Sequence, residues 1–379
     1  MNIILLLICW FLWFLVFASR AILAPLLPII ETEFQTSHAV AGSLLLFLTS
    51  GMTVSYLFVS SWLNLRVGYK RAILLSLLFM VLFIFLMGYI RSYSELAILC
   101  FIVGLGSGVY IPAVYPILTT VFAQRHWGKV ISFHETGAAV ASPLIPLLTA
   151  FSLAHIEWRT LFSILSLALL FVTALFWRLS PNPSPEKKTS FPWRSLLTKP
   201  VFWIVLAVFT MGATAMNGLY NITPLFLIHE RGFDLETANR ILGYTRAGGF
   251  IAILLAGLII DRLGAKPVML GTLLIAGLST IALAEVRGFG WIVAVMLLQA
   301  SVGVVIFPTM LFSIARITTL HERGPFTSLA MGIAILVSVG VAPVIMGAIA
   351  DRWSFEVGIL LVGVATTLSC LLLRWIPKI

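Results

Sequence analysis

Two stretches of this 379-residue chain share one pattern: S-W-L-N-L-R-V-G-Y-K-R at residues 61–71 and G-L-I-I-D-R-L-G-A-K-P at residues 257–267. Each follows an apolar segment long enough to cross a membrane. Gly68 and Gly264 stand 196 residues apart, which is about half of the chain. The spacing predicts two similar halves.

The composition predicts a membrane protein. Hydrophobic residues make up 60% of the chain, charged residues only 10%, and the mean hydropathy is +1.09. A soluble surface needs more charge. Runs of 18 or more apolar residues each suffice to cross the bilayer as helices, which satisfy their own backbone hydrogen bonds. Solid apolar blocks exclude the alternation of a membrane β-barrel. We predict an all-α membrane protein of twelve transmembrane helices, at 3–30, 39–63, 72–91, 95–122, 129–153, 157–178, 200–229, 236–260, 268–285, 289–316, 325–349 and 354–375.

A polar, proline-rich stretch separates the two sets of six helices. Residues 180–199 contain four prolines together with Lys187 and Lys188. We therefore predict an N-terminal bundle at 1–179, a linker at 180–199 and a C-terminal bundle at 200–379. Six-helix repeats joined in this way are a known transporter plan, with substrate held near mid-membrane.

The basic residues predict the orientation. One set of alternate loops holds sixteen of the 24 Lys and Arg residues, from Arg66 to Lys378, and the other holds six. The basic excess marks the cytoplasmic side. We expect both termini and the linker to lie in the cytoplasm, and the protein to span the inner cell membrane many times. Residues 3–17 resemble a signal-peptide core, but no basic residue precedes them and the apolar run continues past Arg20, so a first helix is expected.

Other function classes find no support in the sequence. The net charge of +10 is spread over short loops, so no nucleic-acid partner is expected. Cys9, Cys100 and Cys370 lie far apart and show no metal-ligand spacing. There is no nucleophile–base spacing and no phosphate loop, so neither an enzyme nor a cofactor or metal is expected.

The loop pattern resembles the signature of the major facilitator superfamily, G-x-L-x-D-R-x-G-x-K/R. The second copy matches it at Gly257, Asp261, Arg262, Gly264 and Lys266. The first copy keeps Arg66, Gly68, Lys70 and Arg71, while Ser61 and Leu65 replace the Gly and the Asp. In the family this loop belongs to the cytoplasmic gate. The resemblance therefore implies two six-helix bundles and a gate with a weaker charge network in the N-terminal half.

Two arginines are expected inside the membrane, where a charge is costly and usually functional. Arg20 precedes Pro28 by eight residues, a spacing similar to that of a first-helix arginine in anion-transporting (sialin-like) facilitators. The resemblance implies that it binds the anionic group of the substrate. Arg246 lies near the middle of the eighth predicted helix, and we expect the two arginines, one in each half, to face one cavity and to bind the anion together. The alternatives are that Arg20 reaches outward to water and that Arg246 bonds to a backbone carbonyl.

One buried acid and its neighbour are candidates for proton coupling. Glu135 lies well inside the fifth predicted helix, next to His134, which either carries a proton near neutral pH or is packed within the helix bundle. Glu135 either carries a proton or forms a structural pair with an arginine such as Arg66 or Arg125. Sialin-like proteins often have an acid in G-x-G-E-G on the fourth helix, where this chain has Ser107, so their coupling scheme does not carry over.

Neutral polar residues complete the predicted site. Each of them either lines a substrate cavity or forms a hydrogen bond between helices. These residues are Tyr110, Tyr115, Asn217, Tyr220, Asn221 and Gln299.

Together these features predict a monomeric transporter of a small organic anion in the lipid bilayer. It would work by alternating access and be coupled to protons. The first alternative is a proton-coupled multidrug or metabolite exporter of the same fold. Such exporters usually keep a full G-x-x-x-G-P motif on the fifth helix, whereas Gly137–Pro143 resembles it only in part, with Ala141 in place of the second Gly and Ser142 before the proline. The second is a membrane receptor on a transporter fold that moves nothing.

Overall fold

The computed structural model describes residues 2–181, 183 and 193–376. Within them the chain is helical and contains no strand. Eleven helices are long and apolar enough to cross a membrane, and α12 supplies a twelfth span if its two bent parts count as one. The predicted helix ranges agree to within a few residues at most ends. The predicted linker residues Lys187 and Lys188 lie outside the described part.

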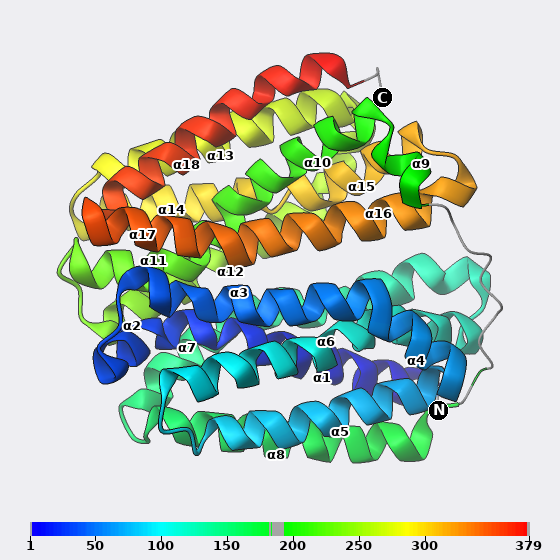
Figure 1. The fold of residues 1–379 in the computed structure, drawn as a ribbon. Coiled ribbons are helices and arrows are strands. Elements are labelled where there is room, and N and C mark those ends of the chain that lie inside the picture. Colours follow the sequence, from blue (N-terminus) through cyan, green and yellow to red (C-terminus); the bar gives the residue numbers. More distant parts are fainter. Residues whose placement is uncertain (1, 182, 184–192, 377–379) are drawn as a thin grey trace. The chain divides into compact units, whose positions relative to one another are not determined.

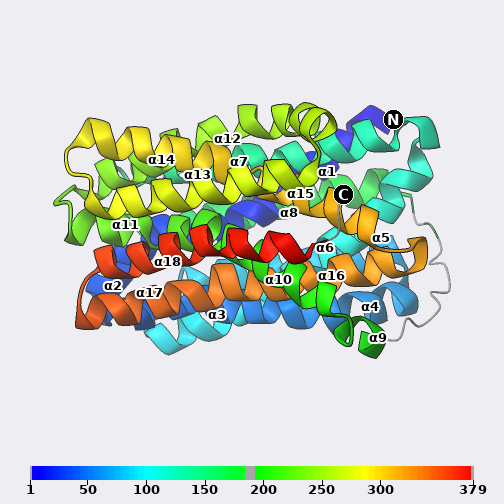
Figure 2. The same cartoon turned by 90° about the horizontal axis from the view of Figure 1, so that it is seen from above.

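The first compact unit comprises residues 1–26 and 47–188. Within it α1 packs against α7 and α8, and α5 packs against α6 and α8, as Figures 1 and 2 show. The helices that contribute to this unit are α1 (Asn2–Ala21), the end of α3 (His38–Val54), the π-helical turn η1 (Ser55–Val59), α4 (Ser60–Val67), α5 (Tyr69–Met87), α6 (Tyr93–Val121), the 3-10 turn η2 (Gln124–His126), α7 (Trp127–Leu153) and α8 (Trp158–Leu179).

The second unit comprises residues 27–46 and 189–379. In it α13 packs against α18 and α14, and α10 packs against α16 (Figure 1). Its helices from residue 193 onward are α9 (Trp193–Leu197), α10 (Pro200–Ala213), η3 (Thr214–Gly218), α11 (Leu219–His229), α12 (Leu235–Leu263), α13 (Ala265–Glu285), α14 (Phe289–Gly303), α15 (Ile306–Ile317), α16 (Leu320–Ile335), η4 (Leu336–Val341), α17 (Ala342–Arg352), α18 (Phe355–Ser369) and η5 (Cys370–Trp375). The short helix α9 falls inside the predicted linker and is held by Leu196, which is buried in the core of this unit.

One segment differs from the predicted domain boundaries. Residues 27–46 contain most of α2 (Leu23–Phe34) and the start of α3, and they pack with the second unit. The backbone amides of His38 and Ala39 donate to the Asp351 carboxylate at 2.8 and 3.1 Å. A Cβ atom on Gly42 would lie 3.0 Å from the Pro343 carbonyl oxygen, so α3 and α17 approach closely there. These contacts are the physical reason for the assignment.

The repeated loop pattern folds in the same way in both units. Gly68 and Gly264 have φ angles of 83° and 82° and join α4 to α5 and α12 to α13. Lys70 donates to the Ser180 carbonyl oxygen at 2.6 Å, and Lys266 donates to the Ile376 carbonyl oxygen at 2.9 Å. In each unit the lysine thus reaches the carbonyl end of the last helix, where a cation is favourable. The similarity of the two halves extends to single hydrogen bonds.

The backbone at Gly264 generates a stability prediction. Because a side chain is strained at this φ and ψ, Gly264→Ala should destabilise the protein by about 1–3 kcal/mol. The measurement is the thermal unfolding midpoint in detergent. Gly271→Ala is the matched control, since Gly271 lies within α13 with no heavy atom within 4 Å of an added Cβ. The control should be neutral or stabilising, because Ala is the better helix former. Equal midpoints for the two variants would contradict the prediction.

Candidate functional site

Arg20 lies in the last turn of α1, where the first span is interrupted. Ile22 separates α1 from α2, and Pro25 has no N–H to continue the helical ladder to Ala21. The guanidinium folds back along α1, with its Cζ 5.1 Å from the Trp13 ring centroid and 5.0 Å from that of Phe17. The side chain thus points toward the N-terminal end of its helix. In the predicted orientation this is inward and not toward the outer water.

The polar contacts of Arg20 leave donor capacity unused. Its Nη1 lies 3.6 Å from the Met52 sulfur, a weak acceptor. The side chain of Tyr56 in η1 forms a hydrogen bond with the guanidinium, and the Glu135 carboxylate in α7 acts on it electrostatically. Its Nε is buried and has no hydrogen-bond partner in the described chain. A buried N–H without a partner is costly, so this guanidinium is suited to an acceptor from a ligand.

Glu135 and His134 form a connected group with aromatic residues of α1 and α6. Tyr115 donates to Glu135 Oε1 at 2.6 Å, and His134 Nδ1 lies 3.2 Å from the same oxygen. The His134 ring is fully buried and stacks on Trp13 at 6.0 Å, while the Glu135 side chain is 44% exposed. Tyr110 donates to the Cys9 carbonyl at 2.7 Å and lies 3.3 Å from His134 Nε2. Because Glu135 also acts electrostatically on Arg20, a proton on its carboxylate would change the electrostatic field at the guanidinium.

The alternative for Glu135, a structural pair with Arg66 or Arg125, is not formed in this structure. Within the described ranges no ion pair joins Glu135 to either arginine. Arg66 is exposed, and Arg125 Nε donates to His126 Nε2 at 3.1 Å.

Arg246 is held differently. It is buried in α12, with its Cζ 4.1 Å from the Tyr220 ring centroid, and its Nη2 donates to the Met216 carbonyl oxygen. Gln299 Nε2 donates to the neighbouring Ala215 carbonyl oxygen at 2.5 Å. Both carbonyls belong to the π-helical turn η3, and π turns disturb the regular ladder and often occur at functional sites. The backbone-carbonyl alternative for Arg246 is thus present, together with a contact between the guanidinium and the Tyr220 ring.

Arg246 also lines a small cavity of the second unit. Tyr220, Thr223 and Gln299 line it too. Of the other predicted residues, Asn221 is buried and Asn217 half-buried, and neither is among the residues that line the cavity. The structure thus brings Arg246, Tyr220 and Gln299 together in one unit, and Arg20, Glu135, His134, Tyr110 and Tyr115 in the other.

The gate residues are placed by the two glycine turns. Arg66, Arg71, Asp261 and Arg262 are exposed, and Gly257 has no heavy atom within 4 Å of an added Cβ. Asp261 makes no ion pair within the described residues. The expected charge network of the gate therefore stays a prediction.

Sequence reasoning missed several residues of the arginine site. Trp13 lies seven residues before Arg20, two helical turns away on the same face, so helical spacing was an available signal. Met52 and Tyr56 come from another span, and nothing in their sequence neighbourhood indicates the contact.

The π turn generates a second prediction. Gln299→Leu keeps the side-chain volume but leaves the buried Ala215 carbonyl without its donor, so it should cost about 1–3 kcal/mol of stability. Gln124→Leu is the control, because Gln124 is exposed in η2. The thermal unfolding midpoint in detergent should fall for the first variant only. A midpoint unchanged in both would mean that another group satisfies the carbonyl.

Comparison with known proteins agrees with this architecture. Over 59% of its length this chain is 25% identical to the 3-(3-hydroxy-phenyl)propionate transporter of Escherichia coli K12, of which the match covers 57%. A shorter match, covering 30% of this chain and 28% of its relative, is 26% identical to the multidrug resistance protein MdtG of E. coli O1:K1. The fold matches a bacterial homologue of the human lysosomal transporter Spinster, in an inward-facing and unoccupied conformation. The TM-score is 0.82 at 16% identity, covering 98% of this chain and 96% of the other. Residues 9–253 and 241–379 match the Major Facilitator Superfamily, to which this chain belongs.

Proposed function

We propose that this transporter moves a small organic anion by alternating access and that Arg20 is the main contact for the anionic group. The observation that carries the proposal is the half-buried Arg20 guanidinium, whose Nε has no hydrogen-bond partner in the described chain. A charge in a membrane span is costly, so an arginine with unused donors there favours an anionic ligand. The planar guanidinium pairs well with the two oxygens of a carboxylate.

The surroundings of Arg20 favour an anion with an apolar body. Trp13, Phe17 and Met52 border the guanidinium and offer ring faces and a thioether. Aromatic and apolar walls around a few polar groups are typical of small-molecule sites. The transport of 3-(3-hydroxy-phenyl)propionate by a relative supports an aromatic carboxylate as the first class to test.

For Arg246 we propose a second contact with the anion during the transport cycle. The hydrogen bond to the Met216 carbonyl oxygen uses only Nη2 of the Arg246 guanidinium, so part of the donor capacity of this side chain stays available. Tyr220 and Gln299 line the same small cavity and would contribute neutral polar contacts. We propose the same supporting role for Asn217, Asn221, Tyr110 and Tyr115.

Coupling to protons is proposed through Glu135, with His134 as its neighbour. When Glu135 is ionised, its negative charge competes with the substrate for Arg20. Protonation removes that competition, so a proton and an anion bind together. The groups around the carboxylate are Arg20 from α1, Tyr56 from η1, Tyr115 from α6 and His134 from α7. Joint entry avoids a cost of about 2.3 kcal/mol per charge at 100 mV.

We further propose that the protein works as a monomer in the inner membrane, with both termini in the cytoplasm. The excess of Lys and Arg on one set of loops supports this orientation.

A multidrug exporter is the second candidate. The match to MdtG favours it, although that match covers less than a third of either chain. A receptor that moves nothing would bind a ligand without any flux. Ligand stabilisation and uptake measurements distinguish both candidates from an anion transporter.

The first functional prediction concerns ligand binding. In a thermal-shift screen of the purified protein, an aromatic carboxylate should stabilise wild type by about 2.7 kcal/mol at 100 times its dissociation constant. Arg20→Gln should abolish the shift, and Arg246→Gln should reduce it. Arg91→Gln is the control, because Arg91 is exposed between α5 and α6. Stabilisation of every protein by hydrophobic cations, with no response to anions, would favour the exporter. Binding without uptake into proteoliposomes would favour the receptor.

The second functional prediction concerns pH. Because protonated Glu135 no longer competes for Arg20, anion affinity in wild type should rise as the pH falls. In Glu135→Gln the affinity should stay high and independent of pH, while an imposed proton gradient should no longer drive accumulation in proteoliposomes. Anion affinity in Glu135→Gln that still follows wild type across the pH range would disprove the coupling role.

A further inference from the structure

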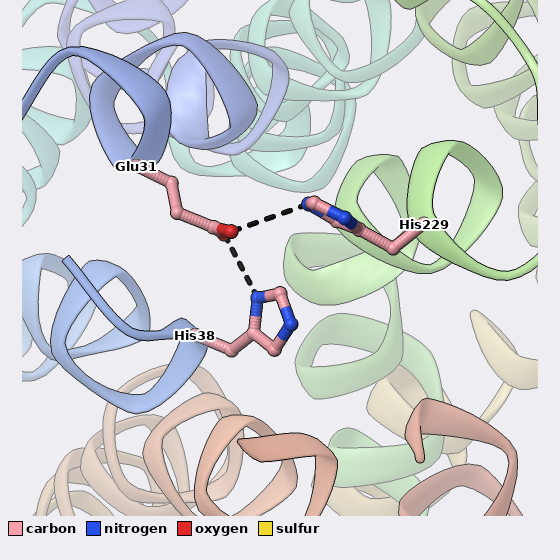
Figure 3. Close-up of side chains that lie close together, drawn as sticks. All are labelled: Glu31, His38 and His229. Carbon is pink, nitrogen blue, oxygen red and sulfur yellow. Dashed lines mark hydrogen bonds and ion pairs between the residues drawn. The ribbon is translucent and has the colours of Figure 1, made fainter. Parts of the chain in front are cut away.

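Three side chains of the second unit converge outside the arginine site. Glu31 lies in α2, His38 is the first residue of α3, and His229 is the last residue of α11. Glu31 Oε2 lies 2.9 Å from His38 Nδ1, and Glu31 Oε1 lies 3.2 Å from His229 Nε2. Figure 3 shows the carboxylate pointing between the two imidazole rings. One ligand atom from each residue falls within 4.8 Å of the other two.

These distances are close to those of a tetrahedral metal site. Zinc binds imidazole nitrogen at about 2.0–2.1 Å and carboxylate oxygen at about 2.0–2.2 Å, which separates the ligand atoms by about 3.3 Å. The two nitrogen–oxygen separations already lie near that value. The three ligand atoms lie within 4.8 Å of one another, so movement of the imidazole nitrogens toward one shared ion would complete the geometry. Two histidines and a glutamate are also a known zinc ligand set that leaves the fourth position open.

The surroundings of the cluster favour a cation. The carboxylates of Asp351 and Glu230 act electrostatically on His38, in addition to Glu31. Arg231 is the arginine nearest to His229 in the sequence, and it forms an ion pair with Glu356, whose Oε1 lies 2.5 Å from the Arg231 Nη1. The local field is therefore negative.

The cluster is also accessible and positioned. The side chains of Glu31, His38 and His229 are 11%, 20% and 41% exposed, so an ion can enter. The hydrogen bonds from the His38 and Ala39 amides to Asp351 fix the start of α3. Glu230, next to His229, accepts from the backbone amides of Phe355 and Glu356, which fixes the end of α11.

We propose that Glu31, His38 and His229 bind a divalent transition-metal ion of the zinc class. His38 Nδ1, His229 Nε2 and a Glu31 oxygen supply three ligands, and water fills the fourth position. Magnesium and calcium prefer all-oxygen sites and should bind poorly. The ion would fasten the turn between the first two spans to the end of the seventh span. By the predicted orientation the site faces outward, so it would respond to metal outside the cytoplasm.

The test is calorimetric titration of the purified full-length protein with zinc chloride, after removal of any histidine tag. Wild type should bind one ion per chain. Glu31→Gln, His38→Ala and His229→Ala should each weaken binding by at least about tenfold, because even groups behind the ligands contribute that much. His155→Ala is the control, since His155 is exposed in the turn after α7 and outside the cluster. Its affinity should equal that of wild type.

A spectrum of the unaltered protein keeps the test independent of variant folding. Cobalt chloride added to wild type should give the intense visible bands of tetrahedral Co²⁺, and zinc should abolish them. Absence of saturable zinc binding in wild type would overturn the proposal. So would unchanged affinity in variants that keep the wild-type unfolding midpoint, or displacement of zinc by equimolar magnesium or calcium.

Discussion

The cost of an unsatisfied polar group in hydrocarbon is the constraint on which the rest of this structure depends. No water is available there to bond a free N–H or C=O, so the spanning chain must pair its own backbone groups. The described residues do so as helices. Where a helix is interrupted, the backbone groups that lose their helical partners also need hydrogen bonds. Several polar side chains lie beside such interruptions. Gln299 and Arg246 donate to two carbonyls of the π-helical turn η3, and η1 carries Tyr56 beside Arg20.

Arg20 and Arg246 differ in the partners that the described chain gives them. Arg246 has a backbone carbonyl and a tyrosine ring as partners, whereas Arg20 has the Tyr56 side chain, a thioether, two ring faces and an unpartnered Nε. The fold therefore gives Arg246 a backbone acceptor, whereas it gives Arg20 only side-chain partners and leaves its Nε unpaired. The structure thereby separates two residues that the sequence presented as equals. The proposed anion site rests mainly on α1.

The sequence allowed prediction of those features that depend on local composition. Apolar length located the spans, the repeated glycine–lysine pattern revealed the two halves, and charge inside an apolar run picked out Arg20, Arg246 and Glu135. Contacts between spans could not be predicted from the sequence, because they depend on how each helix is rotated about its axis. Tyr56 beside Arg20 and the joining of Glu31 and His38 to His229 are of this kind. The packing of residues 27–46 with the second unit was missed for the same reason.

The two arginines do not occupy matching positions of the repeat. The offset of 196 residues that relates Gly68 to Gly264 also relates Arg20 to Met216, which is the residue whose carbonyl accepts from Arg246. In the first half the arginine lies on the first span and contacts Met52 on the second. In the second half it lies on the second span and contacts the first. The helical framework is thus duplicated, as the matching hydrogen bonds of Lys70 and Lys266 show. The buried arginine, by contrast, lies on the first span of one half and on the second span of the other. Duplication alone would have placed the charges at matching positions, so the duplicated framework does not determine where the arginines lie, and their unequal placement is consistent with the proposed binding of an asymmetric anion.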